Sequence, residues 1–156
     1  MTQDARPAPT QPLADGVRAM WRWEAAFAAL VVVATAFAIA AWIDELMPWL
    51  PLAAALGEIA AVLVLPRMKH DRWRWELDDE ELDIVQGVWS VTRTIVPLTR
   101  IQHVAVQRTG WTALFGIVRL HVHTAADATT IPGLVPARAD DVRDRILARL
   151  QTPDDL

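Results

Sequence analysis

The sequence predicts an α+β membrane protein, in which a two-helix transmembrane hairpin is followed by a small β-barrel or sandwich capped by a C-terminal helix. Residues 25–43 and 46–65 form two long apolar runs with a short acidic turn between them. From Trp73 onward apolar and polar residues alternate, which is typical of strands. Residues 136–150 return to helical spacing, with charged side chains mainly on the other faces.

The composition limits the classes of function. The chain has 156 residues, enough for one domain and an appendage, and its net charge of −4 argues against a nucleic-acid partner. Cysteine is absent from the sequence, which excludes disulfides, thiolate metal ligands and a cysteine nucleophile. Hydrophobic residues make up 53% of the chain, and their excess lies almost entirely between residues 25 and 65.

The two ends of the chain are predicted to be tails. Residues 1–20 are interpreted as a disordered cytoplasmic tail, because the start of the chain is rich in Pro, Ala, Gln and Thr and has little apolar surface to bury. It does not resemble a signal peptide, since the apolar run begins only after residue 24 and ends without a clear cleavage site. Residues 152–156 form the second predicted tail.

Residues 21–66 are predicted to form the transmembrane hairpin. The first apolar run has nineteen residues without a charge. As a helix it would be about 28 Å long, against a hydrocarbon core of about 30 Å. The turn at Asp44 and Glu45 is so short that the second run must return antiparallel to the first. A buried soluble helix is the alternative, but so short a chain has no second layer to wrap one. Tryptophans at the predicted interfaces are Trp21, Trp23, Trp42 and Trp49.

Basic residues flank the hairpin on both outer sides, whereas its turn is acidic. The positive-inside rule therefore predicts that both termini are cytoplasmic and that residues 67–151 form a cytoplasmic domain. The cluster after the second run either contacts anionic lipid, at about 1 kcal/mol per residue, or only sets the topology. We weigh these two interpretations equally. Its members are Arg67, Lys69, Arg72 and Arg74.

The cytoplasmic domain is predicted to contain six or seven short strands and one helix. A small barrel or bent sandwich with the helix at its open end fits this order of elements. Gly87 is expected to mark a bulge or bend. The predicted strands cover residues 73–77, 82–86, 91–96, 101–107, 117–124 and 128–131, and the helix covers residues 136–150.

Three sequence motifs in this domain resemble those of a known family. They are the segment Pro97-Leu98-Thr99-Arg100-Ile101-Gln102, the pair Phe115-Gly116 and the pair Thr124-Ala125. Together with the two apolar runs, they make residues 20–150 similar to the YdbS-like family of bacterial membrane-anchored PH-like domain proteins. The resemblance implies a pleckstrin-homology-like (PH-like) fold and a place in the bacterial inner (cytoplasmic) membrane. It also implies a companion membrane protein with further PH-like domains. It implies little about activity.

Glu58 is the main candidate interaction residue of the hairpin. A carboxylate in the middle of a membrane helix is costly and usually faces protein or water. Three interpretations stay open for Glu58. It contacts another subunit, it is protonated, or it lies near the membrane interface because the second helix begins later than residue 46. Small residues beside it permit close helix approach. They are Ala53, Ala54, Ala55, Gly57, Ala60 and Ala61.

Arg100, Gln102 and Trp111 are the candidate interaction residues of the domain. Arg100 either contacts an anion or bridges backbone carbonyls or an acidic side chain, and we favour the bridging role. Gln102 is expected to satisfy backbone groups at a strand end. Trp111 is the better interface candidate of the 108–115 connection, whereas Phe115 is expected in the core.

Three histidines are the obvious metal candidates, but we predict no metal, cofactor or catalytic residue. If residues 101–107 and 117–124 pair antiparallel, His103 lies opposite His121, with His123 on the same face. No carboxylate ligand or general base accompanies them in sequence, so a polar strand face is the favoured interpretation. Paired carboxylates, a Ser-His-Asp spacing and a glycine-rich phosphate loop are also missing from the sequence.

These features predict a non-enzymatic integral membrane protein. Its cytoplasmic PH-like domain would serve protein–protein interaction or membrane complex assembly. The expected partners are the lipid bilayer and another PH-like-domain membrane protein or a second copy of this chain. The alternative is membrane-surface lipid recognition through the basic juxtamembrane segment. The acidic turn at residues 78–81 argues against a phosphoinositide pocket there.

Overall fold

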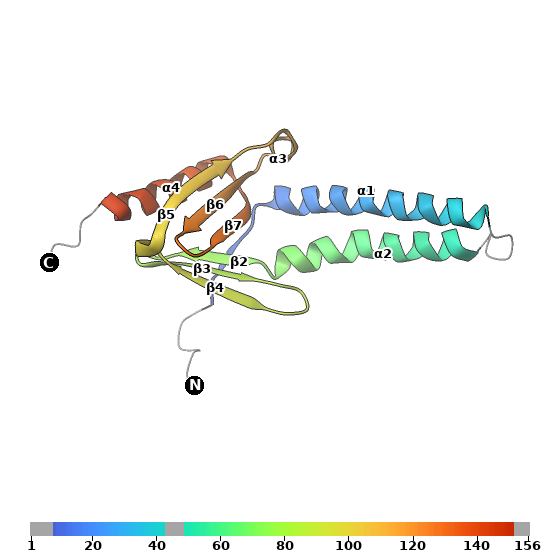
Figure 1. Ribbon diagram of the computed structural model, residues 1–156, viewed down its shortest axis with the longest axis horizontal. Helices are drawn as coiled ribbons and strands as arrows, with labels where there is room; N and C mark the ends of the chain where they lie inside the picture. The colour runs from blue at the N-terminus through green and yellow to red at the C-terminus, as the bar shows by residue number, and fades with distance from the viewer. Residues whose placement is uncertain (1–7, 43–48, 152–156) are drawn as a thin grey trace. The chain divides into compact units, whose positions relative to one another are not determined.

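The computed structural model describes residues 8–42 and 49–151 (Figure 1). The chain divides into two compact units, of which one is a helical hairpin at residues 18–68. The other is a domain built from the chain up to Val17 and from Lys69 onward. In sequence, the hairpin is therefore an insertion within the domain, which has residues on both sides of it. The predicted turn at Asp44 and Glu45, the first seven residues and the tail at 152–156 lie outside the described residues.

The hairpin consists of two helices, α1 (Asp15–Ala40) and α2 (Trp49–Asp71). Both are long and apolar enough to cross a membrane. Only 11% of the most apolar window of each helix is buried, which argues against a soluble core helix. Each helix extends beyond its apolar run into charged sequence, because arginine and lysine are also good helix formers. Hydropathy therefore misses the start of α1, which lies ten residues before its apolar run, and the end of α2, which lies six residues after its run.

The prediction of a disordered tail at residues 1–20 is wrong for residues 8–20, of which Asp15 onward belong to α1. Strand β1 (Gln11–Pro12) pairs antiparallel with β2, and Leu13 and Val17 are buried. The indole N–H of Trp75 donates to the carbonyl of Pro12 at 3.2 Å. This segment is ordered because a sheet formed by distant residues offers it an edge and an apolar surface.

The domain contains two antiparallel sheets. The first has the order β1-β2-β3-β4, and the second has the order β5-β6-β7. The six predicted strands are confirmed with small shifts at their ends, and β1 is an additional strand. Their bounds are β2 Arg74–Leu77, β3 Glu81–Gln86, β4 Thr92–Pro97, β5 Ile101–Gln107, β6 Val118–Thr124 and β7 Ala128–Leu134.

Three helical segments complete the domain: a single 3-10 turn η2 (Leu98–Arg100), α3 (Gly110–Leu114) and α4 (Pro136–Gln151). The turn η2 joins the two sheets, and α3 joins β5 to β6. Helix α4 buries one apolar face, as its spacing predicts. The α+β fold of two apolar helices, two small sheets and a C-terminal helix is thus confirmed. The core residues include Trp75, Leu82, Ile84, Leu120, Val122, Ile131, Ala139, Val142 and Ile146.

One ion pair is partly buried on the first sheet. The guanidinium of Arg93 on β4 donates to the carboxylate of Asp83 on β3, with a shortest N–O distance of 2.6 Å. Asp83 and Arg93 belong to register pairs two residues apart on the two strands, so their side chains share one face. The pair satisfies a carboxylate that would otherwise be costly to bury.

Candidate functional site

Glu58 lies in a groove between the two helices of the hairpin. The groove has a volume of about 380 Å³, and Glu58 is its one charged lining residue among those described. The carboxylate is half-buried and has no hydrogen-bonding or ion-pairing partner among residues 8–42 and 49–151. Alanines from both helices line the groove, and Ala55 is the one member of the predicted small-residue surface among its lining residues. The remaining lining residues are Ala26, Ala29, Leu30, Val33, Ala55, Ile59, Val62 and Leu63.

The motif around Arg100 forms the corner between the two sheets. Leu98 is buried, and its backbone N–H donates to the carbonyl of Glu80 at 2.8 Å. Ile101 is also buried as β5 begins. The two apolar members of the motif therefore fix the corner, which gives this part of the pattern a structural role.

The polar members of the same motif point to solvent. Arg100 is exposed and makes no hydrogen bond or ion pair with a described residue. Among the described residues no bridging partner of Arg100 is present, so its bridging role stays a prediction. Gln102 is exposed at a register shift of β5, and its side chain likewise bonds to no described residue. Its expected role in satisfying backbone groups therefore stays a prediction.

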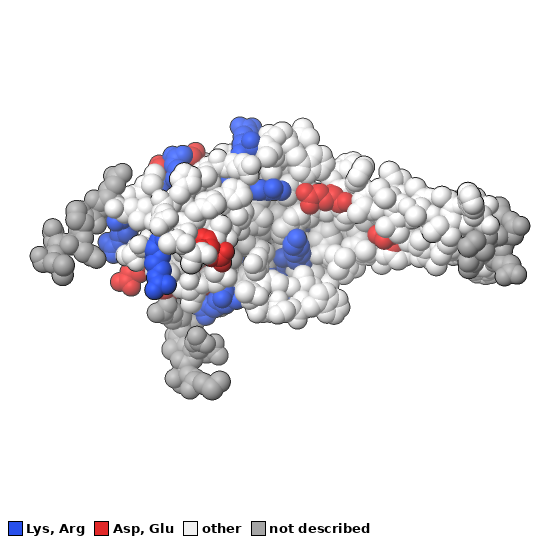
Figure 2. Space-filling model, in the orientation of Figure 1, with Lys and Arg blue, Asp and Glu red and all other residues white. Residues whose placement is uncertain are grey.

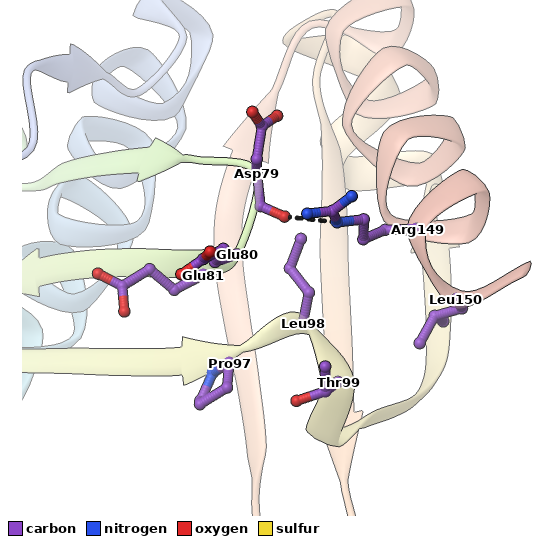
Figure 3. A pocket seen from close by; sticks show the side chains of 8 residues that line it. All are labelled: Asp79, Glu80, Glu81, Pro97, Leu98, Thr99, Arg149 and Leu150. Atoms are coloured by element: carbon purple, nitrogen blue, oxygen red, sulfur yellow. Dashed lines mark hydrogen bonds between the residues drawn. The ribbon is translucent and has the colours of Figure 1, made fainter. Parts of the chain in front are cut away.

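A shallow pocket of about 520 Å³ lies beside this corner (Figure 3). Residues of the β2–β3 turn, the β4–η2 junction and the end of α4 line it. Asp79, Glu80 and Glu81 supply carboxylates, whereas Arg149 supplies one guanidinium and donates to the carbonyl of Asp79 at 3.0 Å. An anionic phosphate would meet an excess of negative charge here. The geometry thus argues, as the acidic sequence does, against a phosphoinositide pocket at this turn.

The basic segment after the second apolar run divides into two parts. Arg67 and Lys69 are exposed on the last turns of α2. Arg72 donates to the carbonyl of Val88 at 2.6 Å, and Arg74 donates to the carbonyl of Trp73 at 2.8 Å. Arg72 therefore joins the end of α2 to the β3–β4 connection, whereas Arg74 bonds only locally. Figure 2 shows charged side chains gathered over the domain and few over the helices on the face in view.

The three histidines share one face of the second sheet, but the predicted pairing is wrong by two residues. His103 lies opposite His123, whereas His121 lies opposite Ala105. His121 bonds through its two ring nitrogens to Thr130 at 2.8 Å and to Gln107 at 2.9 Å. Partial burial, together with the charges of His123 and Arg119, lowers the pKa of His121. Among the described residues no three potential ligands are grouped to hold a metal ion.

Trp111 lies on the short helix α3. The Thr109 hydroxyl accepts from the backbone N–H of Thr112, and the Thr112 hydroxyl accepts from that of Thr109, so a capping box fixes this helix. Trp111 is exposed and meets the half-buried Phe115 edge to face at 5.2 Å between ring centres. Phe115 is thus less buried than predicted, because it packs at the rim of the domain.

Two further residues, Trp89 and Leu114, are among the most exposed apolar residues of the domain and were not predicted from the sequence. Trp89 is 93% exposed in the β3–β4 connection, and Leu114 is 75% exposed on α3. Part of a signal for Trp89 was present in the sequence, because Gly87, two residues before it, was expected to mark a bend. Leu114 had no such signal, because a helix of five residues is too short for the spacing of its apolar residues to indicate which side is buried.

The hairpin, the two sheets and the terminal helix define a membrane-anchored domain protein of the PH-like class. Comparison with known proteins supports this class and identifies the family. The chain belongs to the bacterial PH domain family, whose model matches residues 13–150. It is 33% identical over 152 residues to the UPF0699 transmembrane protein YdbS of Bacillus subtilis (strain 168), covering 90% of this chain and 92% of that protein. No solved structure matches the chain significantly.

The family match begins at residue 13, well before the first apolar run. This agrees with the structure, in which Leu13 is part of the domain core. The resemblance to YdbS-like proteins drawn from the three motifs is confirmed, as is the transmembrane character of the protein's class.

Proposed function

We propose that this protein is a non-enzymatic assembly module of the bacterial cytoplasmic membrane. The hairpin crosses the membrane twice and binds another membrane protein, or a second copy of this chain, through the Glu58 groove. The PH-like domain is thereby presented on the cytoplasmic face for protein–protein interaction. The observation that carries the proposal is a carboxylate without a described partner in a groove otherwise lined by apolar side chains.

The cost of Glu58 supports a partner. Placing a charged carboxylate at the centre of a membrane helix costs about 2.5–3.5 kcal/mol on insertion scales. A hydroxyl, amide or basic side chain from a third helix would offset part of that cost by donating a hydrogen bond to the carboxylate. The alanines of the groove allow such a helix to approach closely, which adds van der Waals contact in lipid.

The distribution of basic residues supports the cytoplasmic placement. Arg18 and Arg22 precede the first apolar run, and Arg67 and Lys69 follow the second. The positive-inside rule then assigns both ends of the hairpin to the cytoplasm. Single cysteines introduced into the cysteine-free chain test this directly. A membrane-impermeant maleimide added to intact cells should label Trp42→Cys and spare Ala126→Cys, and the reverse pattern would contradict the placement.

The partner is tested by co-purification of the full-length protein in mild detergent, followed by mass spectrometry. Glu58→Leu removes the carboxylate, while Leu56→Ala changes an exposed neighbour that does not line the groove. We expect a specific membrane partner or self-oligomer with the native chain and Leu56→Ala, and its loss with Glu58→Leu. Retention with Glu58→Leu would assign recognition to the domain instead. A monomer under every condition would refute the assembly role.

Lipid recognition by the juxtamembrane segment is the second candidate, favoured by the exposure of Arg67 and Lys69. Each is expected to add about 1 kcal/mol of attraction to an anionic leaflet. The full-length chain in nanodiscs should therefore be more stable in anionic than in zwitterionic lipid. That difference should shrink in the Arg67→Gln, Lys69→Gln double variant. Equal stability in both lipids would remove this candidate.

A further inference from the structure

Two connections of the domain present large apolar side chains to solvent. The first, called here the Trp89 tip, covers residues 87–91 between β3 and β4 and exposes Trp89 and Val91. The second, called the Trp111 tip, covers residues 108–117 between β5 and β6 and exposes Trp111 and Leu114. Figure 1 shows both connections at the same end of the two sheets, where β2 begins. The domain thus concentrates exposed apolar surface at one end.

Each tip is attached to the place where one hairpin helix joins the domain. Arg72, the residue after α2, donates from its guanidinium to the carbonyl of Val88 in the Trp89 tip. Gly16, in the first turn of α1, lies against the Trp111 tip so closely that a Cβ there would lie 2.2 Å from the carbonyl oxygen of Phe115. All of these residues belong to the compact unit of the domain.

Both tips are held in a fixed conformation. Gly87 has a positive φ of 128°, and a Cβ at this position would lie 1.8 Å from the carbonyl oxygen of Ser90. This position therefore requires glycine, and it sets the bend that exposes Trp89. In the Trp111 tip, the capping box of Thr109 and Thr112 fixes α3. Fixed apolar side chains lose little conformational entropy when they are covered.

The length of chain between the apolar run and the domain sets the distance to the bilayer. Leu65 ends the second apolar run, and Arg72 follows seven residues later. At 1.5 Å per residue this is a rise of about 10 Å. The apolar face of an interfacial segment is buried about 5–10 Å into the headgroup and acyl boundary. The rise from the apolar run to Arg72, where the Trp89 tip is attached, is therefore comparable with the depth of such an interfacial contact.

We propose that the Trp89 and Trp111 tips insert into the headgroup region of the cytoplasmic leaflet. They form a second membrane contact of the domain, separate from the hairpin and from the Glu58 groove. Tryptophan is the residue that prefers this region, because its ring is apolar and its N–H remains hydrogen-bonded to water or headgroups. The occupant is the bilayer that already holds α1 and α2, so the contact continues the membrane attachment of the helices. It gives the domain a fixed orientation on the membrane.

The experiment uses the full-length chain in lipid nanodiscs with an environment-sensitive fluorophore on a single introduced cysteine. Ser90→Cys and Gly110→Cys place the label beside Trp89 and Trp111. Both positions are exposed, and a side chain at residue 110 meets open space. Ala126→Cys, in the exposed β6–β7 connection at the other end of the second sheet, is the control. Val91→Cys provides a second label site in the Trp89 tip if Ser90→Cys does not fold.

Two quenchers distinguish the environments of the labels. A lipid with a nitroxide near its headgroup should quench the labels in both tips severalfold more than the control, and aqueous iodide should show the opposite order. Trp89→Ser should lower the lipid quenching measured at residue 90. Iodide quenching of either tip label equal to that of the control would overturn the proposal. Labels protected from both quenchers would also overturn it, because a protein partner would then cover the tips.

Discussion

Replacement of Leu13 by alanine tests whether the segment before the hairpin is part of the domain. Leu13 is 3% exposed, next to the two-residue strand β1 that pairs with β2. A buried leucine replaced by alanine costs about 2–5 kcal/mol, through lost burial and the cavity that remains. A domain of this kind has about 5–15 kcal/mol of stability in total. The substitution should therefore lower the denaturant midpoint of the domain substantially.

The assay is denaturant unfolding of the full-length protein in detergent, followed by tryptophan fluorescence. Trp75 is one of eight tryptophans that contribute to this signal, and it should respond to unfolding of the domain because it is buried and donates its indole hydrogen bond to Pro12. Val135→Ala is the matched control, because Val135 is 54% exposed and should change stability by less than about 0.5 kcal/mol. Equal midpoints for the two variants would refute the conclusion that residues 8–17 complete the domain.

Three further predictions concern the domain. Gly133→Ala should destabilise it by about 1–3 kcal/mol in the same unfolding assay, because the new Cβ would lie 2.1 Å from a methyl carbon of Val17. Asp83→Asn should cost about 1–3 kcal/mol by leaving the partly buried Arg93 without its carboxylate; an unchanged midpoint would mean that the ion pair contributes nothing. Folding lowers the pKa of His121 below 6.5, so the unfolded chain binds more protons and stability should fall as the pH drops from 6.5 through the folded pKa. His121→Gln should weaken this pH dependence, measured as the unfolding midpoint across that range, and an unaltered slope would assign it to other groups.

The regular elements of the domain could be predicted because their local pattern and their burial agree. The strand predicted at residues 101–107 is β5, and the helix predicted at 136–150 is α4 with one more residue. In α4, the apolar residues Ala139, Val142 and Ile146 recur at helical spacing and are buried, whereas in β5 only Ile101 is buried. Strand ends elsewhere moved by a few residues, since hydrogen bonding to a neighbour rather than composition decides where a strand ends.

The segment at residues 8–17 could not be predicted from local pattern. Its large apolar residues are only Leu13 and Val17, too few to establish a periodic pattern, and two of its residues are prolines. Its order depends on β2, which lies more than sixty residues away in sequence. Proline is also compatible with an edge strand, where it need not donate a hydrogen bond. Composition alone therefore made a structured segment resemble a tail.

The candidate site residues also divide into those whose position follows from local sequence pattern and those whose position does not. The half-buried position of Glu58 follows from helical spacing, because the apolar residues on its side of α2 line the same groove. The pairing of the histidines depends on a bulge in β5 and on the length of the connection that contains α3, and neither is encoded in the strand pattern. The outward direction of Arg100 and Gln102 likewise results from the turn η2 and that bulge.

Site-specific photocrosslinking in native membranes tests the assembly role most directly. A photoreactive amino acid at Ile59 would lie in the Glu58 groove, whereas one at Leu56 would be exposed outside it. We expect a discrete protein adduct from position 59, either a second copy or another membrane protein, and its loss when Glu58→Leu is added. Adducts formed only with lipid at both positions would contradict the assembly role.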